Sequence, residues 1–345
     1  MKKILIAANR TEKTKRYVAN APGCDISVRR ALLKKGFSVD MLYLEKRDFG
    51  APLYKLKKKI LDANPSCIFN LFDGFRSDSS KEAEFAEILE MTGIPFTGNS
   101  PWTLAACLDK ETTKRILEKR GIATPRGVFI KSLADLRMDG LNFPLFIKPC
   151  FEDASIGINP DVFLAKENDI HGIVPRKLKE FPKGLIIEEF IPGKEYHAGF
   201  LRNFPYEMLG ISVNNYSKHK DFLPFLTYSS KWKSDSEEFR KLIPSLDENI
   251  PAHLKYKIAE ISSKAGEALG CRGYYRVDLR ERDGQIFVLD MNPNPDISIY
   301  SGFMRQAYRI GYAYDDVIAR IVALAGVSAK EEEEGVCALR TKKHA

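Results

Sequence analysis

Residues 273–296 read GYYRVDLRERDGQIFVLDMNPNPD, two partly apolar runs on either side of an Asp-Gly pair at 283–284. An Asp-Gly pair between two such runs is a strong signal for a β-hairpin. A three-residue loop at 283–285 would place Asp278 directly opposite Asp290 on the neighbouring strand. The stretch therefore predicts a hairpin that brings two carboxylates together.

The same register predicts a polar cluster on one face of the hairpin. It places Arg276 opposite Asn292. Because residues two apart share a face of a strand, these two side chains and the two aspartates would project from one side. Facing carboxylates repel unless a cation lies between them. Two carboxylates and an amide oxygen suit Mg²⁺, which proteins hold with few ligands plus phosphate oxygens. Asp278, Asp290 and Asn292 are thus predicted metal ligands, with a solvent-facing polar hairpin as the alternative.

A lysine ends the apolar run at 143–148 and is followed by Pro149 and by a loop with small residues at 152–157. A lysine in this place can reach a phosphate as a point charge. The backbone N–H groups of such a loop can close over phosphate oxygens. The pattern makes Lys148 a candidate phosphate ligand, although a lysine at a strand end is more often a surface residue.

Acidic residues end the apolar run at 184–191, where Glu188 and Glu189 lead into a turn and Glu195 follows. Carboxylates accept hydrogen bonds from an amino group or from sugar hydroxyls. Such a ligand is one interpretation, and solvated acids at a strand end are the other.

The order of predicted elements divides the chain. Up to about residue 105, strands alternate with helices, which favours a parallel sheet covered on both faces. Strands are expected here at 3–8, 38–44, 67–72 and 94–98, and helices near 25–35, 53–63 and 80–92. Farther on, strands are expected at 127–131, 143–148, 161–165, 184–191, 195–202 and 206–213, and helices at 110–120, 252–269 and up to about 326. Residues 214–250 read as a long irregular segment, which is typical of a lid or binding loop.

The features occur in the order lysine strand, acidic hinge and metal hairpin, and in this the chain resembles the ATP-grasp enzymes, in particular the D-alanine–D-alanine ligases. The resemblance covers roughly residues 60–305 and includes IFNLFDG at 68–74, GIPFTG at 93–98, LDK at 108–110 and LTYSSKW at 226–232. It implies an α/β protein with the ATP-grasp fold, in which an N-terminal Rossmann-like parallel-sheet domain precedes two α+β domains that grip the nucleotide. The units it implies are the Rossmann-like domain at 1–105, the small ATP-grasp subdomain at 106–190, the C-terminal subdomain with the metal site at 191–330 and a charged tail at 331–345.

The resemblance also implies the cofactors, ATP and Mg²⁺, with two ions expected and Mn²⁺ as the alternative metal. By residue-to-residue match, the nucleotide-binding positions are Lys110, Lys148, Glu188, Glu189, Ile191 and Glu195. The two lysines would contact phosphates, and Glu188 and Glu195 would bind the adenine amino group and the ribose hydroxyls. The backbone from Glu189 to Ile191 would bind the adenine edge.

The catalytic positions implied in the same way are Arg276, Lys231 and Ser155. Arg276 would stabilise the oxyanion of a tetrahedral intermediate. Lys231 would reach the phosphates from the lid, and Ser155 lies on the loop that would cover the γ-phosphate. The resemblance also assigns the metal to Asp278, Asp290 and Asn292.

Departures from these ligases lie at the substrate site. A basic segment fills the place where the ligases carry a glycine-rich opening with a glutamate, and it contains Arg10, Lys13, Lys15 and Arg16. Ala154, Trp232, Asp290 and Asp296 stand where the ligases have Ser, Tyr, Glu and Gly, whereas Ser301 is retained. One hypothesis is that the basic segment meets an acidic or larger carboxylate substrate at the end of the first sheet. A solvated basic loop is the alternative.

Bulk properties limit the partners. The 345 residues carry a net charge of +8, with lysines scattered through helical stretches, so nucleic-acid binding is permitted but not expected. The apolar runs are shorter than the roughly 20 residues of a membrane helix, so no membrane association is expected. The six cysteines form no CxxC pair, which is typical of reduced thiols in a cytoplasmic protein. The resemblance allows a homodimer.

The predicted function is ATP-dependent, ADP-forming ligation of a small carboxylate and an amine, and the expected substrates are amino acids or similar molecules. In this chemistry an acyl phosphate forms first, and metal ions and lysines offset the charge of the moving phosphoryl group. Two alternatives stay open: a genuine D-alanine–D-alanine ligase of peptidoglycan synthesis, and a nucleotide-binding protein that has lost catalysis. Which acid and which amine react is not predicted.

Overall fold

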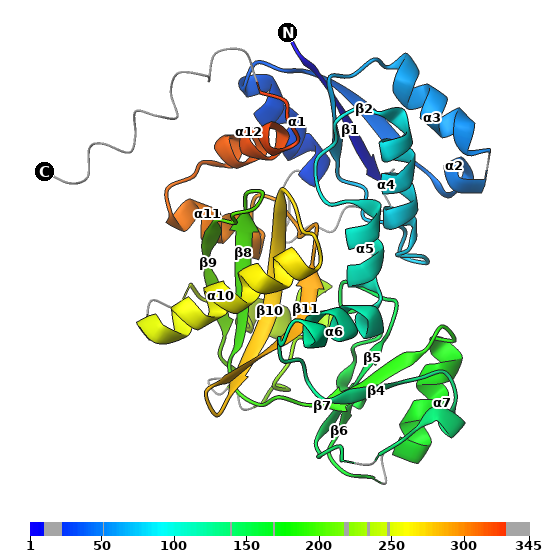
Figure 1. The fold of residues 1–345 in the computed structure, drawn as a ribbon, viewed down its shortest axis with the longest axis vertical. Coiled ribbons are helices and arrows are strands. Elements are labelled where there is room, and N and C mark those ends of the chain that lie inside the picture. The colour runs from blue at the N-terminus through cyan, green and yellow to red at the C-terminus, as the bar shows by residue number, and fades with distance from the viewer. Residues whose placement is uncertain are drawn as a thin grey trace, which may run out of the picture.

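The computed structural model describes residues 1–9, 23–50, 52–138, 140–167, 170–216, 221–232, 235–246 and 249–328, with the side chains of Lys231 and Trp232 excepted (Figure 1). The basic segment at 10–16 and the charged tail at 331–345 lie outside these residues. The described chain forms three sheets and the helices around them. No helix in these ranges is long and apolar enough to cross a membrane.

The N-terminal sheet is parallel, as the alternation of elements predicts. Its strand order is β2-β1-β3, and both neighbours of β1 run parallel to it. Its elements are β1 (Lys3–Asn9), α1 (Cys24–Lys34), β2 (Ser38–Leu44), α2 (Lys46–Gly50), α3 (Leu53–Asp62), β3 (Cys67–Asn70) and α4 (Lys81–Thr92). The strand expected at 94–98 is reduced to one parallel bridge between Ile68 and Phe96. The apolar start of the chain is buried because β1 is the central strand.

Two capped helices lead from this unit into the next, α5 (Pro101–Leu108) and α6 (Lys110–Lys119). Sequence patterns predict only the second. The Ser100 side chain accepts from the Thr103 N–H at the start of α5, and Asp109 accepts from Thr112 at the start of α6. These caps satisfy N–H groups that a helix leaves unpaired.

The small sheet is antiparallel, in the order β4-β7-β5-β6. Its elements are β4 (Gly127–Ile130), η1 (Leu133–Asp135), β5 (Leu145–Pro149), η2 (Pro160–Val162), β6 (Phe163–Leu164), α7 (Ile170–Glu180) and β7 (Leu185–Glu189). Helix α7 packs on this sheet through Ile170 and Val174. Strand residues that alternate with the ones packed under α7 therefore point to the opposite face of the sheet.

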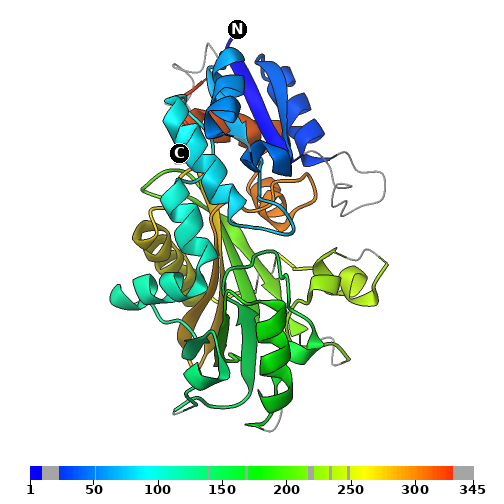
Figure 2. The same cartoon turned by 90° about the vertical axis from the view of Figure 1, so that its right-hand side faces the viewer.

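The large sheet carries the predicted hairpin and is also antiparallel, in the order β11-β10-β8-β9. Its elements are β8 (Glu195–Leu201), β9 (Met208–Asn214), α8 (Tyr228–Trp232), α9 (Glu237–Lys241), α10 (Ala252–Ala268), β10 (Tyr274–Arg282) and β11 (Gln285–Asn292). Helix α10 covers one face, whose buried residues include Ala198, Tyr275 and Val277. The segment expected to be irregular contains two short helices, α8 and α9, which stand out beside the large sheet in Figure 2.

The hairpin has the predicted register but reaches it by a different route. Arg282 pairs with Gln285, so the loop has two residues and not three. Asp283 and Gly284 both have positive φ, as a tight hairpin turn of this kind requires. One residue of β11, Leu289, is then skipped in a bulge, and beyond it Asp278 pairs with Asp290. The two deviations cancel, because each shifts the register by one residue in opposite senses.

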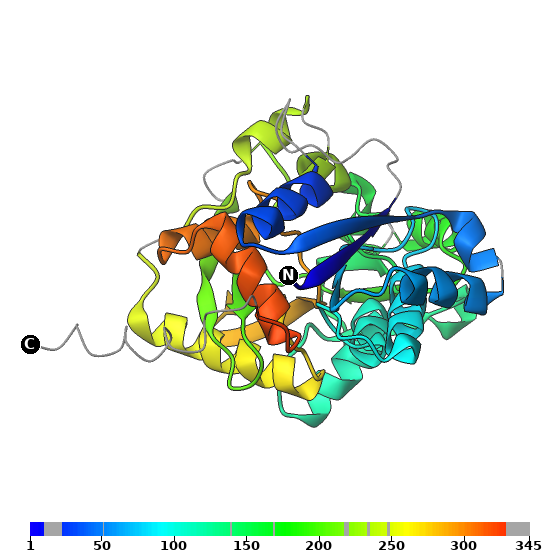
Figure 3. The ribbon, with the colours of Figure 1, turned by 90° about the horizontal axis from the view of Figure 1, so that it is seen from above.

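The end of the described chain returns to the N-terminal sheet. Helices α11 (Gly302–Arg309) and α12 (Tyr314–Leu324) follow the hairpin, and α12 packs against α1, as Figure 3 shows from above. One buried cluster joins Ile4 and Ile6 of β1 with Phe303, Ile318 and Val322. The large sheet and the first sheet are thereby held together through a shared core.

A glycine in α10 sets how closely this helix approaches the large sheet. A Cβ at Gly266 would lie 2.5 Å from the ring of Tyr275, which is buried and stacked on Phe200. Gly266→Ala should therefore lower the free energy of unfolding by about 1–3 kcal/mol, the usual cost of overpacking. Gly172→Ala in α7 is the control, because a Cβ there meets no atom within 4 Å. Urea unfolding would compare the two, and equal midpoints would contradict the argument.

Candidate active site

A cleft of about 1490 Å³ opens between the two antiparallel sheets and the carboxyl edge of the N-terminal sheet. All the predicted site residues line it except Lys231. Lys231 belongs to α8, and its side chain lies outside the described part of the structure. The cleft therefore brings together side chains from sequence positions 110 to 292.

One face of the large sheet supplies the polar floor of the cleft. Cross-strand pairing sets Asp290, Asp278, His197 and Ser212 in one row across the four strands. A neighbouring row holds Asn292 and Arg276, followed by Gly199 and Gly210, which carry no side chain. The row on the other side holds Arg280, Glu195 and Asn214. The alternation of polar and apolar residues along the strands thus gives a charged face opposite the apolar face under α10.

Arg276 and Asp278 form a two-point ion pair in the middle of this floor. The Arg276 Nε and Nη2 atoms donate to the two carboxylate oxygens over 2.7 and 2.8 Å. The His197 Nδ1 lies 2.8 Å from Asp278 Oδ1. Burial alone would raise the pKa of Asp278, but Arg276 and His197 outweigh burial and hold its pKa well below the usual range. The carboxylate is therefore ionised at neutral pH.

Asp290 lies opposite, and within the described chain no cationic side chain forms an ion pair with it. Its Oδ1 accepts only the Met291 N–H, over 3.1 Å, among the described contacts. Burial raises the pKa of Asp290, and Asp153 and Asp278 raise it further against the opposing effect of Lys110 and Lys148. A largely buried carboxylate without an ion-pair partner is a group that a metal ion would stabilise.

The donor set here fits Mg²⁺ by its chemistry. Two carboxylates and the Asn292 amide meet on one face, and the Asn292 Nδ2 donates to Asp278 over 3.3 Å, which leaves its Oδ1 available. No group of three or more His, Cys, Asp or Glu able to hold a metal occurs in the described ranges. The protein would thus supply few ligands, as is usual for Mg²⁺ completed by phosphate oxygens.

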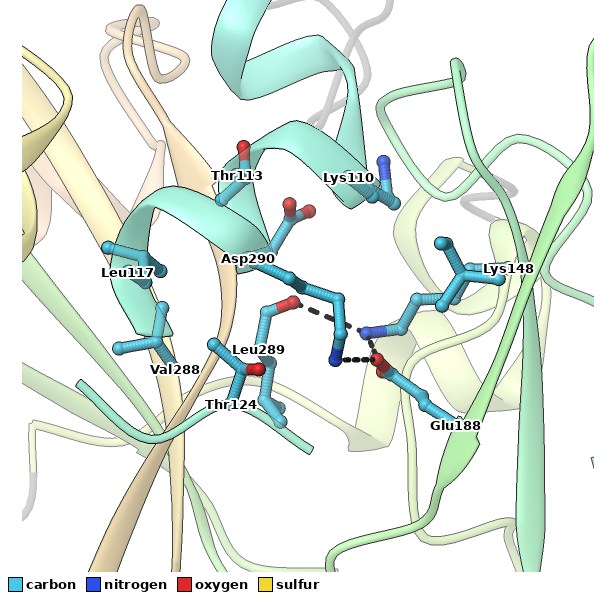
Figure 4. Close-up of a pocket in the computed structure, with 11 residues that line it drawn as sticks. Lys110, Thr113, Leu117, Thr124, Lys148, Glu188, Val288, Leu289 and Asp290 are labelled. Atoms are coloured by element: carbon cyan, nitrogen blue, oxygen red, sulfur yellow. Dashed lines mark hydrogen bonds and ion pairs between the residues drawn. The ribbon is translucent and has the colours of Figure 1, made fainter. Parts of the chain in front are cut away.

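Across the cleft, Glu188 of the small sheet is contacted by Lys148 of the same sheet (Figure 4) and by Lys114 of α6. The Lys148 Nζ lies 2.5 Å from Glu188 Oε1, and the Lys114 Nζ lies 3.0 Å from Oε2. Lys148 also donates to the Leu289 carbonyl of β11 over 3.3 Å. Burial would raise the pKa of Glu188, but the two lysines lower it overall. Lys148 therefore bridges the two sheets that line the cleft, as well as facing Asp290.

Lys110 and Ser155 border the cleft from other elements. Lys110 begins α6, and its Nζ donates to the backbone carbonyl of Glu152 in the loop after β5. In that loop Ala154 and Ser155 both have positive φ. A turn of this kind can point backbone N–H groups into a concavity that binds an anion.

The segment predicted to be the hinge presents backbone and not side chain. Glu189 points its carboxylate away from Glu188, because neighbouring residues of a strand face opposite sides. Its Oε1 accepts from the backbone N–H and the side chain of Asn142 over 3.0 and 2.9 Å. The Ile191 N–H has no hydrogen-bond partner among the described residues, while the residue is 2% exposed. A buried N–H without a partner is unfavourable unless a ligand accepts from it.

Glu195 is neutralised by Arg280, a residue that the sequence patterns did not single out. The Arg280 Nη2 lies 2.8 Å from Glu195 Oε2. The same guanidinium donates to the carbonyls of Ile191 and Pro224 over 2.8 and 2.5 Å and lies 4.7 Å from the Phe190 ring centroid. Its signal in the sequence was position: Arg280 follows Arg276 and Asp278 at the same two-residue spacing.

Two further polar residues of the site were given no role by the sequence patterns. His197 lies on the same face of β8 as Glu195, two residues farther on, and its Nε2 lies 2.9 Å from the Asn214 amide. Lys114 follows Lys110 by one helical turn, a spacing that places both on one side of α6. In each case the regular spacing from a predicted residue was the available signal.

Comparison with known protein families shows which proteins this chain resembles. The family described as "D-ala D-ala ligase C-terminus" matches residues 129–323, which include the large sheet and all of the small sheet except the first two residues of β4. A D-alanine–D-alanine ligase of Carboxydothermus hydrogenoformans is 28% identical over 308 residues, covering 86% of this chain and 91% of that protein. An uncharacterized protein of Sinorhizobium fredii is 29% identical over 263 residues, covering 75% of this chain and 74% of that protein.

Solved structures agree with the fold. A D-alanine–D-alanine ligase from Bacillus anthracis complexed with ATP has a TM-score of 0.73 at 21% identity, covering 94% of this chain and 97% of that one. The VanG D-Ala:D-Ser ligase from Enterococcus faecalis has a TM-score of 0.68 at 18% identity, covering 94% and 99%. Together with the family match over more than half of its length, this agreement shows that the chain belongs to the D-alanine–D-alanine ligase family of ATP-grasp enzymes, which are ligases that form a peptide bond.

Proposed function

We propose that this protein is an ADP-forming carboxylate–amine ligase that acts through an acyl phosphate and joins amino acids or amino-acid-like substrates. The observation that carries the proposal is the meeting of two charged surfaces across one cleft. The Arg276–Asp278 pair and Asp290 face it from the large sheet, and Lys148 and Glu188 face it from the small sheet. Phosphoryl transfer needs this combination of fixed cations and acids that hold a metal.

The nucleotide would bind with its base at the hinge and its phosphates toward Asp278 and Asp290, the proposed metal ligands. The Ile191 N–H, which has no partner in the described chain, can donate to a ring nitrogen of adenine, and Glu188 and Glu195 are acceptors on either side of the hinge. Lys110 and Lys148 lie next to Asp290 and oppose its charge. Ser155 would cover the terminal phosphate, and Lys231 would approach from α8.

Asp278, Asp290 and Asn292 would hold Mg²⁺, with two ions expected and Mn²⁺ as a substitute, and the metal would lower the negative charge on the reacting phosphate oxygens. Asp290 is the acid with most to gain, because burial raises its pKa and no cation in the described chain forms an ion pair with it. The side chains of Arg276 and His197 hold Asp278 ionised and oriented, which preserves the site for the metal.

After the carboxylate substrate is phosphorylated, an amine attacks the acyl carbon and negative charge develops on its oxygen. Arg276 is the cation that lies nearest to the metal acids on the large sheet. Burial lowers the pKa of its guanidinium, but Asp278 raises it overall, so the group stays charged. A fixed guanidinium that is already paired and oriented stabilises such an oxyanion without reorganisation.

A genuine D-alanine–D-alanine ligase is the second candidate, because relatives of this chain carry that name. Ser301, which caps α11 and accepts the Met304 N–H, matches a position associated with the second D-alanine. Asp296 stands where those ligases have a glycine, and its carboxylate accepts from the Ser298 N–H and hydroxyl. Because Asp296 lines the cleft, this difference favours a different pair of substrates. A cytoplasmic location and a homodimer remain predictions.

ADP formation with a panel of amino acids would test the proposal. Mg-ATP alone should give little ADP, and one acid with one amine should raise the rate at least tenfold, with a product mass equal to their sum less water. Chelation of the metal with EDTA should abolish the stimulated rate. Stimulation by D-alanine alone would favour the second candidate. A flat response across a broad panel would contradict both and leave a nucleotide-binding protein without this activity.

The oxyanion role of Arg276 predicts a selective loss. Arg276→Ala should lower kcat by roughly 10²–10³-fold, the cost of removing one oxyanion donor. The KM for ATP should change by less than about threefold, because the hinge and Lys148 are untouched. Arg282→Ala, on the same strand but near the turn, is the matched control and should keep full activity. A loss in ATP affinity with kcat preserved would assign Arg276 to the nucleotide instead.

A further inference from the structure

Glu82 enters the cleft from an element that the proposed mechanism does not use. It is the second residue of α4, in the N-terminal unit, and it lines the cleft with Arg276, Asn292 and Asp296. It therefore faces the end of the cleft beyond Asp278 and Asp290, where the acyl carbon and the attacking amine would meet.

An amide from the loop after β11 fixes the position of Glu82. The Asn294 Nδ2 donates to Glu82 Oε1 over 2.7 Å. Asn294 is itself held, because its Oδ1 accepts the Asn99 N–H over 3.1 Å. Gly98, with φ of +88°, permits this close approach, since a Cβ there would lie 2.7 Å from Asn294 Oδ1. Asn294 follows Asn292 by two residues, so Glu82 is tied to the loop that carries a proposed metal ligand.

The charge of Glu82 has no counterpart in the described part of the chain. Its neighbour Lys81 pairs with Glu84 instead, and no cationic side chain there lies within ion-pair distance of Glu82. The acidic groups that face it are Asp73, in the loop after β3, and Asp153, in the loop after β5. Its other titratable neighbours are neutral at pH 7: the Tyr274 phenol of β10 and the Cys107 thiol of α5.

Burial is the main cause that raises the pKa of Glu82 to about 8, and the two aspartates add to it against the opposing hydrogen bond from Asn294. A carboxyl group with a pKa near the working pH is well matched to proton transfer. The second oxygen of Glu82 has no partner among the described residues, whereas Oε1 is held by Asn294. One oxygen is thus positioned by the protein and the other is left for a ligand.

We propose that Glu82 binds the ammonium group of the amine substrate and accepts its proton before the amine attacks the acyl phosphate. The inference rests on the proposed function and specifies the class of its second substrate, a primary amine that arrives as the ammonium ion. Asp73 and Asp153 add to the attraction for this cation.

The protons and charges balance in this step. One N–H proton moves to the Glu82 carboxylate, and the freed lone pair forms the C–N bond. The C–O bond to phosphate breaks, and the phosphate leaves with its electron pair. A second N–H proton goes to the departing phosphate, which gives an amide, hydrogen phosphate and neutral Glu82. Glu82 then returns its proton to solvent.

Hydroxylamine separates this step from the formation of the acyl phosphate. It is a nucleophile that is mostly unprotonated at neutral pH, so it traps an acyl phosphate as the hydroxamate without help from a base. Glu82→Gln keeps the length and the oxygen that accepts from Asn294 but cannot take a proton. With the acid that gives most ADP in the panel, this variant should form hydroxamate within about twofold of the wild-type rate. Amide formation with the paired amine should fall by roughly 10²–10⁴-fold.

The pH profile supplies a second readout that a structural role would not move. The base must be unprotonated, so kcat/KM for the amine should rise with pH up to the pKa of about 8 and then level off. In Glu82→Gln this inflection should disappear. Glu84→Gln on the same helix is the control, since Glu84 pairs with Lys81, and it should leave both reactions unchanged.

Three outcomes would overturn the proposal. Amide formation by Glu82→Gln within threefold of wild type would show that no proton acceptor is needed there. An equal loss of hydroxamate and amide would show that Glu82 acts on the structure and not on the amine. If the wild-type protein gave no hydroxamate with any acid, the proposed function would fail, and the role of Glu82 with it.

Discussion

The ion pair between Arg276 and Asp278 is the contact on which the polar face of the large sheet depends. Both groups are withdrawn from water, and a charge in such a place is tolerated only beside an opposite charge with satisfied hydrogen bonds. The two-point geometry provides this, with His197 on a third direction. Removing one member of a buried pair commonly costs about 3–5 kcal/mol, because the other is left uncompensated. The chain thus keeps an acid ionised where a metal would bind.

Arg280 extends the same principle to the nucleotide end of the cleft. One guanidinium contacts the carboxylate of Glu195, the carbonyl of Ile191 at the hinge and the carbonyl of Pro224 just before α8. The hinge with the start of β8, and the more distant segment before α8, therefore meet on one rigid planar group of β10, which suits several acceptors at once. A flexible lysine would hold fewer of them. The hinge, the ribose-side acid and the approach to α8 are in this way held in a fixed relation.

Periodicity in the sequence predicted the parts of the fold that depend on local chemistry. The hairpin register follows from alternation and from Asp283-Gly284, and the parallel sheet follows from the alternation of strands and helices. What periodicity missed depends on one local irregularity and on distant contacts. Asp283-Gly284 favours the two-residue turn, but no residue of β11 marks the bulge at Leu289 that offsets it. The return of α12 to α1, and the approach of Glu82 to Asn294, join residues more than two hundred positions apart.

The acids of the cleft divide into two kinds by their surroundings. Asp278, Glu188 and Glu195 each have a basic side chain in contact, and the net effect lowers the pKa of each. Asp290 and Glu82 have no such contact in the described chain, and burial raises the pKa of both. The first kind is balanced within the protein and maintains the shape of the cleft. The second kind is balanced only when a cation arrives from outside, so the protein holds these two acids ready at a cost in stability. A divalent metal meets this need at Asp290 and an ammonium ion meets it at Glu82, which separates the phosphoryl end of the cleft from the amine end.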